Sequence, residues 1–96
     1  MTRQRHSPVR PFWFCANCVR PWPCEQAKAE LVADYADEPR SLGVDMADCL
    51  TEADRDLAEL YWAPPDPVEH YGRFLGWVKA ALAASRHRDA GHFRWF

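Results

Sequence analysis

Three cysteines and one histidine near the amino terminus are the residues of this chain best suited to chemistry. Cys15, Cys18 and Cys24 lie within a stretch of ten residues, and His6 lies nine positions before the first of them. Two cysteines separated by two residues fit a tight turn in which both sulfurs face one ion. Thiols this close together indicate a metal site, a disulfide framework or a redox centre, and each of these needs different surroundings.

The surroundings of the thiols favour a metal. No apolar stretch reaches the ~20 residues of a membrane span, and the basic amino terminus lacks the apolar run of a signal peptide. We therefore expect a cytoplasmic protein, in which disulfides are rare. A thioredoxin-like use of Cys15 and Cys18 requires a βαβ unit, which the sequence does not predict. Three cysteines and one histidine are an ordinary ligand set for a closed structural zinc site, and zinc is the expected ion.

The fourth ligand has several candidates. His6 is the first, because the proline-rich stretch between it and Cys15 can fold back over the ion. Cys49 is the second, although it lies on the apolar face of a predicted helix, where a free cysteine is usually a small core residue. His87 and His92 near the carboxyl terminus are further alternatives. The predicted metal set is His6, Cys15, Cys18 and Cys24.

The elements that position these residues follow from the proline and apolar patterns. Residues 1–24 combine four prolines with four large aromatic side chains, which argues against a helix or a central strand. Apolar residues then recur at helical spacing over about 24–35, 41–61 and 67–84. Asp66 is the expected N-cap of the third helix. We predict an all-α fold, a small three-helix bundle over residues 25–84.

Two terminal segments flank this predicted bundle. Residues 1–24 form a metal-stapled arm rich in proline and aromatic residues. Residues 85–96 form a basic, aromatic tail, which is disordered, packs on the bundle or serves as a short recognition segment. Four tryptophans are expected to cover the arm and fill the bundle, namely Trp13, Trp22, Trp62 and Trp77. His70 is expected to be solvated.

Charge is strongly segregated along the chain. The net charge is −2, but residues 25–69 carry thirteen acids against three basic side chains. Nucleic-acid binding is not expected, since this acidic middle would repel phosphates. On the second predicted helix one face is acidic, and we expect it to be solvated or to dock a basic partner; its members are Asp45, Asp48, Glu52, Asp56 and Glu59.

The expected function is non-catalytic. The sequence has no Gly-x-Ser-x-Gly, no P-loop and no His-Glu-x-x-His motif. A closed four-ligand zinc also lacks the open position that metal catalysis needs. We therefore predict a small zinc protein that is not an enzyme and acts through contacts with a protein partner.

The cysteine motif resembles that of a group of small actinobacterial proteins often labelled flavin reductases. The likeness extends over most of the chain up to Trp77, and it rests on His6…Trp13-x-Cys15-x-x-Cys18-x-x-x-Trp22-Pro23-Cys24-x-x-Ala27 and Arg73-Phe74-Leu75-Gly76-Trp77. The resemblance implies the same metal set of one histidine and three cysteines. It gives no support to the reductase label, because the sequence has no glycine-rich dinucleotide turn and no strand-rich flavin fold.

The spacing of Cys15, Cys18 and Cys24 is also similar to that of the WhiB-like iron–sulfur regulators. Those proteins carry a further cysteine upstream, where this chain has His6, and a basic DNA-binding end. Their Gly-Trp-Gly-Gly type turn has only a weak counterpart here, at residues 76–78 on a predicted helix. The resemblance implies an alternative function, an iron–sulfur redox sensor or regulator.

Overall fold

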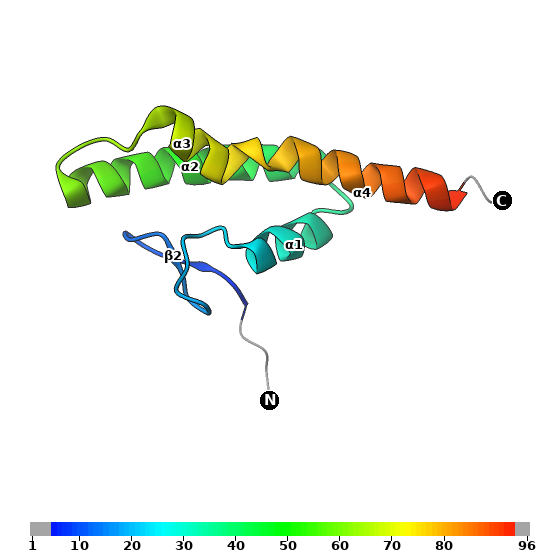
Figure 1. Cartoon of the computed structure of the whole chain (residues 1–96), viewed down its shortest axis with the longest axis horizontal. Coiled ribbons are helices and arrows are strands. Elements are labelled where there is room, and N and C mark those ends of the chain that lie inside the picture. The colour runs from blue at the N-terminus through cyan, green and yellow to red at the C-terminus, as the bar shows by residue number, and fades with distance from the viewer. Residues whose placement is uncertain (1–4, 94–96) are drawn as a thin grey trace.

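The fold is mostly helical, with a small sheet in the amino-terminal arm (Figure 1). A computed structural model describes the backbone of residues 5–93 and the side chains of residues 5–85. The arm contains strands β1 (Pro8–Val9) and β2 (Phe14–Cys15), and helix α1 (Glu25–Asp34) follows it. The helical class was predicted correctly, but the paired strands mean that the fold is not strictly all-α.

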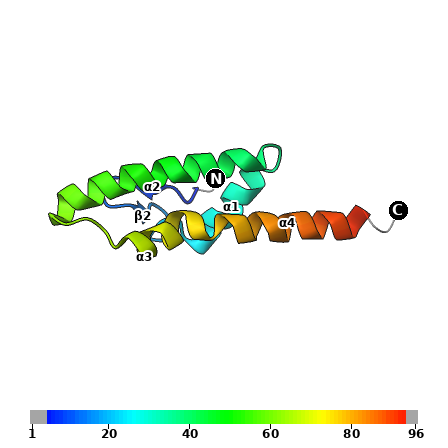
Figure 2. The same ribbon diagram turned by 90° about the horizontal axis from the view of Figure 1, so that it is seen from above.

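Two long helical rods form a layer, which we call the helical layer. One rod is α2 (Pro39–Tyr61). The other consists of α3 (Pro67–Tyr71), a π-helical turn η1 (Gly72–Gly76) and α4 (Val78–Phe93). The rods run in opposite directions, and the arm and α1 cover one face of the layer (Figures 1 and 2). The predicted three-helix bundle is therefore better described as a two-rod layer with α1 and the arm packed beneath it.

The helix boundaries follow from local chemistry. Pro39 begins α2 two residues before the predicted start at Ser41, since the first helical turn tolerates a residue that lacks an N–H. Asp66 caps α3 as predicted, and its side chain accepts the N–H groups of Val68 and Glu69. The π-helical turn holds one extra residue per turn, which a count of apolar spacing does not reveal.

The last helix is longer than the sequence predicted. The backbone of α4 stays helical to Phe93, so the segment 85–96 begins as helix and not as an aperiodic tail. The carboxyl-terminal half of α4 projects beyond the other elements (Figures 1 and 2). The side chains of residues 86–96 lie outside the described part of the chain, and with them the tail histidines His87 and His92.

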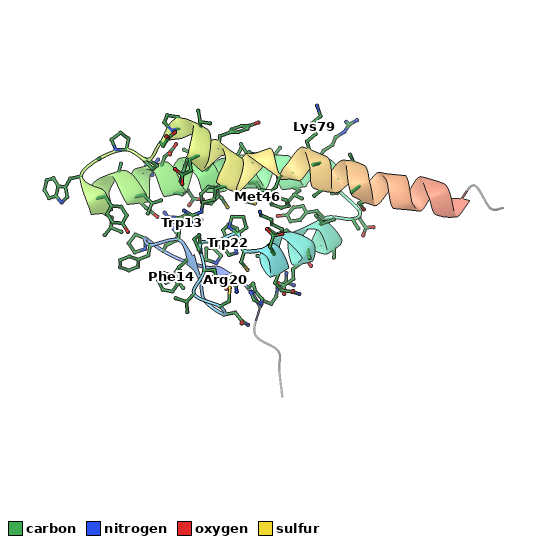
Figure 3. All side chains as sticks on the ribbon, viewed as in Figure 1. Trp13, Phe14, Arg20, Trp22, Met46 and Lys79 are labelled. Carbon is green, nitrogen blue, oxygen red and sulfur yellow. The ribbon has the colours of Figure 1, made fainter. Side chains whose placement is uncertain are left out.

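The arm contributes a large share of the core. Phe74 on η1 is fully buried, and the Trp13 ring meets it edge-on at 5.5 Å, with the Trp22 ring at 6.3 Å. Figure 3 shows Trp13 and Trp22 between the arm and the helical layer, whereas Lys79 points away from the arm. The buried apolar residues are Trp13, Cys15, Trp22, Cys24, Ala27, Leu42, Met46, Ala53, Leu57, Phe74 and Val78.

Two expectations about burial were wrong. Trp62 does not fill the core but is 94% exposed, because it directly follows α2 in a left-handed backbone conformation with φ 59°. His70 is not solvated but only 4% exposed, because its ring packs on Phe74 at 4.8 Å beneath the contact with α2. No described helix is both long enough and apolar enough to cross a membrane.

Candidate metal centre

The structure brings the four residues of the predicted metal set together. His6 precedes β1, Cys15 ends β2, Cys18 lies in the following turn, and Cys24 is the N-cap of α1. Their potential ligand atoms all lie within 4.8 Å of one another. Cys49 is not part of this cluster, and it packs half-buried against the core from α2, as the apolar face of that helix predicted.

The distances inside the cluster suit a single ion. The Sγ atoms of Cys15 and Cys24 are 3.8 Å apart, and each lies 3.2 Å from Nδ1 of His6. Four ligands around one zinc form a tetrahedron, and Zn–S bonds of about 2.3 Å separate two of its sulfurs by about 3.8 Å. All four cysteines of the chain are free thiols. The residues present therefore fit a metal ion.

A small hairpin positions the first cysteine. β1 and β2 pair antiparallel, with Pro8 opposite Cys15 and Val9 opposite Phe14. The backbone N–H of Cys15 then donates to the carbonyl of Arg20 across the turn, at 2.7 Å. Neither strand is long enough to be stable alone in water. Contacts with the cluster and with the helices must therefore fix the hairpin.

Contacts with α1 and with the arm position His6. Its backbone N–H donates to the Glu30 carboxylate at 3.3 Å, and its carbonyl accepts the Trp22 indole N–H at 3.1 Å. The preceding residue, Arg5, pairs with Asp34 on the same helix. The histidine is thus held from both of its backbone groups, which directs its ring towards the sulfurs.

The turn after the two-cysteine motif is strained. Val19 adopts a left-handed conformation with φ 64°, and its N–H donates to the Cys15 carbonyl at 2.9 Å. A β-branched residue at positive φ is a true outlier, because its side chain crowds the backbone. Such outliers persist where the surroundings fix the chain, and they gather at ligand-binding sites. Strain of this kind is expected at Val19 if the backbone of the turn is fixed around a bound ion.

Backbone N–H groups point at two of the sulfurs. Burial raises the pKa of the Cys15 thiol, but hydrogen bonds from the N–H groups of Cys18 and Asn17 and from the side chains of Cys18 and Cys24 together outweigh it, so that the pKa falls to about 7. Burial also raises the pKa of the Cys24 thiol, although its sulfur accepts the N–H of Ala27 at 3.4 Å. Since metals bind thiolates, uptake of an ion here would release protons.

Acidic residues of α2 anchor the arm to the helical layer. Arg10 donates to Glu52 and to Asp56, both at 2.8 Å, and the buried Trp13 indole N–H donates to Asp56 at 2.8 Å. The hydrogen bond from Arg10 holds the pKa of the Asp56 carboxyl below its usual value. The acidic face is therefore not simply a solvated surface, because Glu52 and Asp56 bind the arm and Asp45 accepts the Tyr35 hydroxyl.

Arg73 holds the arm from the other rod. Its guanidinium donates through Nε to the carbonyl of Trp22 at 2.9 Å and through Nη2 to the carbonyl of Trp13. Burial lowers the pKa of this half-buried guanidinium. Sequence reasoning missed Arg10 and Arg73 as anchors. Each arginine lies next to an apolar run, which suggests a structural role, but the sequence does not show which group the guanidinium would bind.

His70 forms a second polar contact inside the fold. Its Nε2 lies 3.2 Å from Oδ1 of Asp54, across the interface between α3 and α2. Burial lowers the pKa of this histidine, against the opposing effect of the Asp54 charge. A neutral ring that packs on Phe74 is thus a core contact, and it stands apart from the metal set.

Comparisons with known proteins give no relative of this chain. No family model matches it, and neither a curated protein nor a solved structure is significantly similar to it. The likeness to the small actinobacterial proteins and to the WhiB-like regulators stays a prediction from the sequence motif. The capacity to bind a metal is carried by the geometry of the four clustered side chains.

Proposed function

We propose that this chain is a zinc protein in which His6, Cys15, Cys18 and Cys24 hold one structural ion. The observation that carries the proposal is the convergence of the four ligand atoms to within 4.8 Å of one another. The 3.8 Å separation of the Cys15 and Cys24 sulfurs supports it, because two thiolates on one tetrahedral zinc are separated by about that distance. Nδ1 of His6 is the nitrogen that faces both sulfurs.

Zinc is favoured over an iron–sulfur cluster. A cluster holds some of its four ligands on different irons with sulfides between them, so the whole ligand set spans more space than the ligand set of one ion. The convergence of all four ligand atoms to within 4.8 Å of one another therefore supports a site with a single ion. The mixed histidine and cysteine set is also common for structural zinc.

The ion has a structural and not a catalytic role in this proposal. Four protein ligands complete the coordination shell of zinc and leave no open position for a substrate or an activated water. Cys15 is fully buried and Cys24 is 7% exposed, so the ion is shielded by the arm. The bound ion would hold Trp13 and Trp22 against Phe74. In this proposal the folded chain acts through contacts between its surface and a protein partner.

Metal analysis with a visible spectrum tests this proposal, on protein purified both anaerobically and in air. We expect one zinc per chain and no absorption above the aromatic band. Iron with a broad visible band would overturn the proposal in favour of an iron–sulfur redox sensor. Cys18→Ser should lose the ion, and Cys49→Ser is the matched control that should keep it. Equal zinc content in the two variants would exclude the four-residue site.

A further inference from the structure

The helical layer has one face that the rest of the described chain leaves uncovered. The arm and α1 lie on the other face (Figures 1 and 2), and Lys79 points away from the arm (Figure 3). Lys79 lines a groove of about 340 Å³ between the start of α2 and the rod of α3, η1 and α4. The lining also includes Arg40 and Gly43 on α2, and Tyr71, Leu75 and Leu82 on the other rod.

The groove exposes apolar side chains along one rod. Tyr71 is 55% exposed, and Leu75 and Leu82 are partly exposed. The three residues share the groove side of the rod and extend over about three helical turns. A strip of this kind between two helices has the form of the grooves into which partner proteins lay the apolar face of a helix.

Gly43 widens the groove at a position where the helix itself does not need a glycine. It is inside α2, where glycine is less favourable than alanine. Its φ is not positive, and a Cβ added there would meet no heavy atom within 4 Å. Neither the backbone conformation nor packing against the described chain therefore requires glycine here. The missing side chain instead leaves room for a group from another molecule.

Both charged residues in the groove lining are cationic, namely Arg40 and Lys79. Within residues 5–85, neither of their side chains forms a hydrogen bond or an ion pair. Asp37 and Glu38 precede the groove in the sequence but do not line it. The start of α2 adds positive potential, because its first turn contains no acidic residue. The acidic charges elsewhere on the chain are screened over about 8 Å at physiological salt, so the groove itself favours carboxylates.

We propose that this groove binds an acidic amphipathic helix of a partner protein. Apolar side chains of that helix lie against Gly43, Leu75 and Leu82, and its carboxylates pair with Arg40 and Lys79. Burial of apolar surface supplies the affinity, and the paired charges fix the orientation of the helix. The proposal rests on the proposed function, since it names the surface and the chemistry of the expected protein contact.

A pair of synthetic helical peptides tests the groove on the full-length, zinc-loaded chain. Both carry leucine at positions i, i+3, i+4 and i+7, and the flanking positions hold glutamate in one peptide and glutamine in the other. NMR spectra follow the backbone amide of Gly43. We expect its resonance to move with the glutamate peptide, which should bind about tenfold more tightly than the glutamine peptide at low salt. Equal binding of both peptides, or of neither, would overturn the proposal.

A glycine substitution separates binding from folding. Gly43→Leu fills the groove with a better helix former, so its Tm should be unchanged or higher while binding of the glutamate peptide is lost. Gly72→Leu is the matched control, because a Cβ at Gly72 also meets no atom within 4 Å and Gly72 does not line the groove. We expect this control to bind the peptide as the wild type does. Unchanged binding by Gly43→Leu, or a Tm several degrees lower, would contradict the proposal.

A second pair of variants tests the charges. Arg40→Gln combined with Lys79→Gln should remove the preference for the glutamate peptide over the glutamine peptide. Arg55→Gln, an exposed arginine of α2 outside the groove lining, should keep that preference. Equal preference in the two variants would show that the net charge of the chain, and not the groove, selects the peptide.

Two further measurements keep the outcomes distinct. No residue of the metal set lines the groove, so zinc content should be unchanged in every variant. Loss of peptide binding with zinc retained would then count against the groove alone, and absence of zinc from the wild type would count against the proposed function. Sedimentation at increasing protein concentration detects self-association. Self-association that disappears in Gly43→Leu would identify a second copy as the occupant and overturn the assignment to a partner protein.

Discussion

The arm and the helical layer hold their shapes by different means. The helices α2 and α4 are fixed mainly by hydrogen bonds between near neighbours in the sequence. The arm has two strands of two residues each, and two of its residues, Trp13 and Val19, are at positive φ. Yet the arm supplies four of the eleven buried apolar residues that form the core. Each region therefore depends on the other, since the layer needs the arm to cover its core and the arm has too little regular secondary structure to keep its shape alone.

Removal of the ion should have the largest effect and would break this mutual dependence. Structural zinc contributes ~10–16 kcal/mol of binding energy, which is comparable with the whole ~5–15 kcal/mol stability of a small domain. We expect a strong chelator to unfold most of the chain, with loss of the near-UV circular dichroism of Trp13 and Trp22. Re-addition of zinc should restore that signal. A melting curve identical with and without chelator would contradict the proposal that a bound ion stabilises the arm.

Truncation of Phe74 tests the shared core directly. This ring contacts Trp13 and Trp22 from the arm and His70 from its own rod. Phe74→Ala should lower the free energy of unfolding by ~3–5 kcal/mol, because the fully buried ring leaves a cavity that the neighbours cannot fill. Urea denaturation of the zinc-loaded protein measures the change. If the chain does not fold, Phe74→Leu gives a milder test.

Tyr71→Ala is the control for this truncation, because Tyr71 lies one position before η1 and is 55% exposed. We expect its effect to stay within about 1 kcal/mol. Equal losses for Phe74→Ala and Tyr71→Ala would mean that the arm and the helical layer do not share a core at this point.

The sequence predicted those features that depend on neighbouring residues. The metal set followed from the spacing of Cys15, Cys18 and Cys24 with His6 upstream. The cap at Asp66 followed from its own side chain and the proline after it. In the structure the four side chains of the predicted metal set lie together and Asp66 caps α3, because the chain itself limits how far these residues can separate.

The sequence could not predict the contacts that join distant elements. Arg10 reaches Asp56 across 46 positions, and Arg73 reaches the Trp13 carbonyl across 60 positions. The burial of His70 likewise depends on the packing of α2 against α3. The π-helical turn was not predicted, because one added residue leaves the apolar pattern of the sequence almost unchanged.

Loss of the Asp56 carboxylate should have an intermediate effect and would loosen the arm from α2. Asp56→Ala leaves the buried indole N–H of Trp13 without an acceptor, which costs ~1–3 kcal/mol. Asp56→Asn keeps an acceptor and should lose less. The pKa of Asp56 is lowered in the folded state, so its contribution is complete above the unfolded value of about 4 and is lost as pH falls through the folded value.

The matched measurement is thermal unfolding of the zinc-loaded wild type, Asp56→Asn and Asp56→Ala. The difference between the wild type and Asp56→Asn should be constant between about pH 6 and pH 8, where the carboxylate is charged in both states. A difference that changes steeply over this range would point to the cysteines of the metal set and not to Asp56.

Substitution of Val19 should have the smallest effect and the opposite sign. Val19→Gly removes a Cβ that disfavours the left-handed backbone of the turn after Cys18, which costs of order 1–2 kcal/mol for a residue with a side chain. Part of this gain is offset, because glycine loses more freedom on folding. We expect a net stabilisation of up to about 1 kcal/mol with unchanged zinc content. Val44→Gly is the control, an exposed valine inside α2, and it should destabilise the helix by about 0.5–1 kcal/mol. If both glycines destabilise equally, the left-handed conformation of Val19 does not cost the folded protein stability, and the turn is not strained.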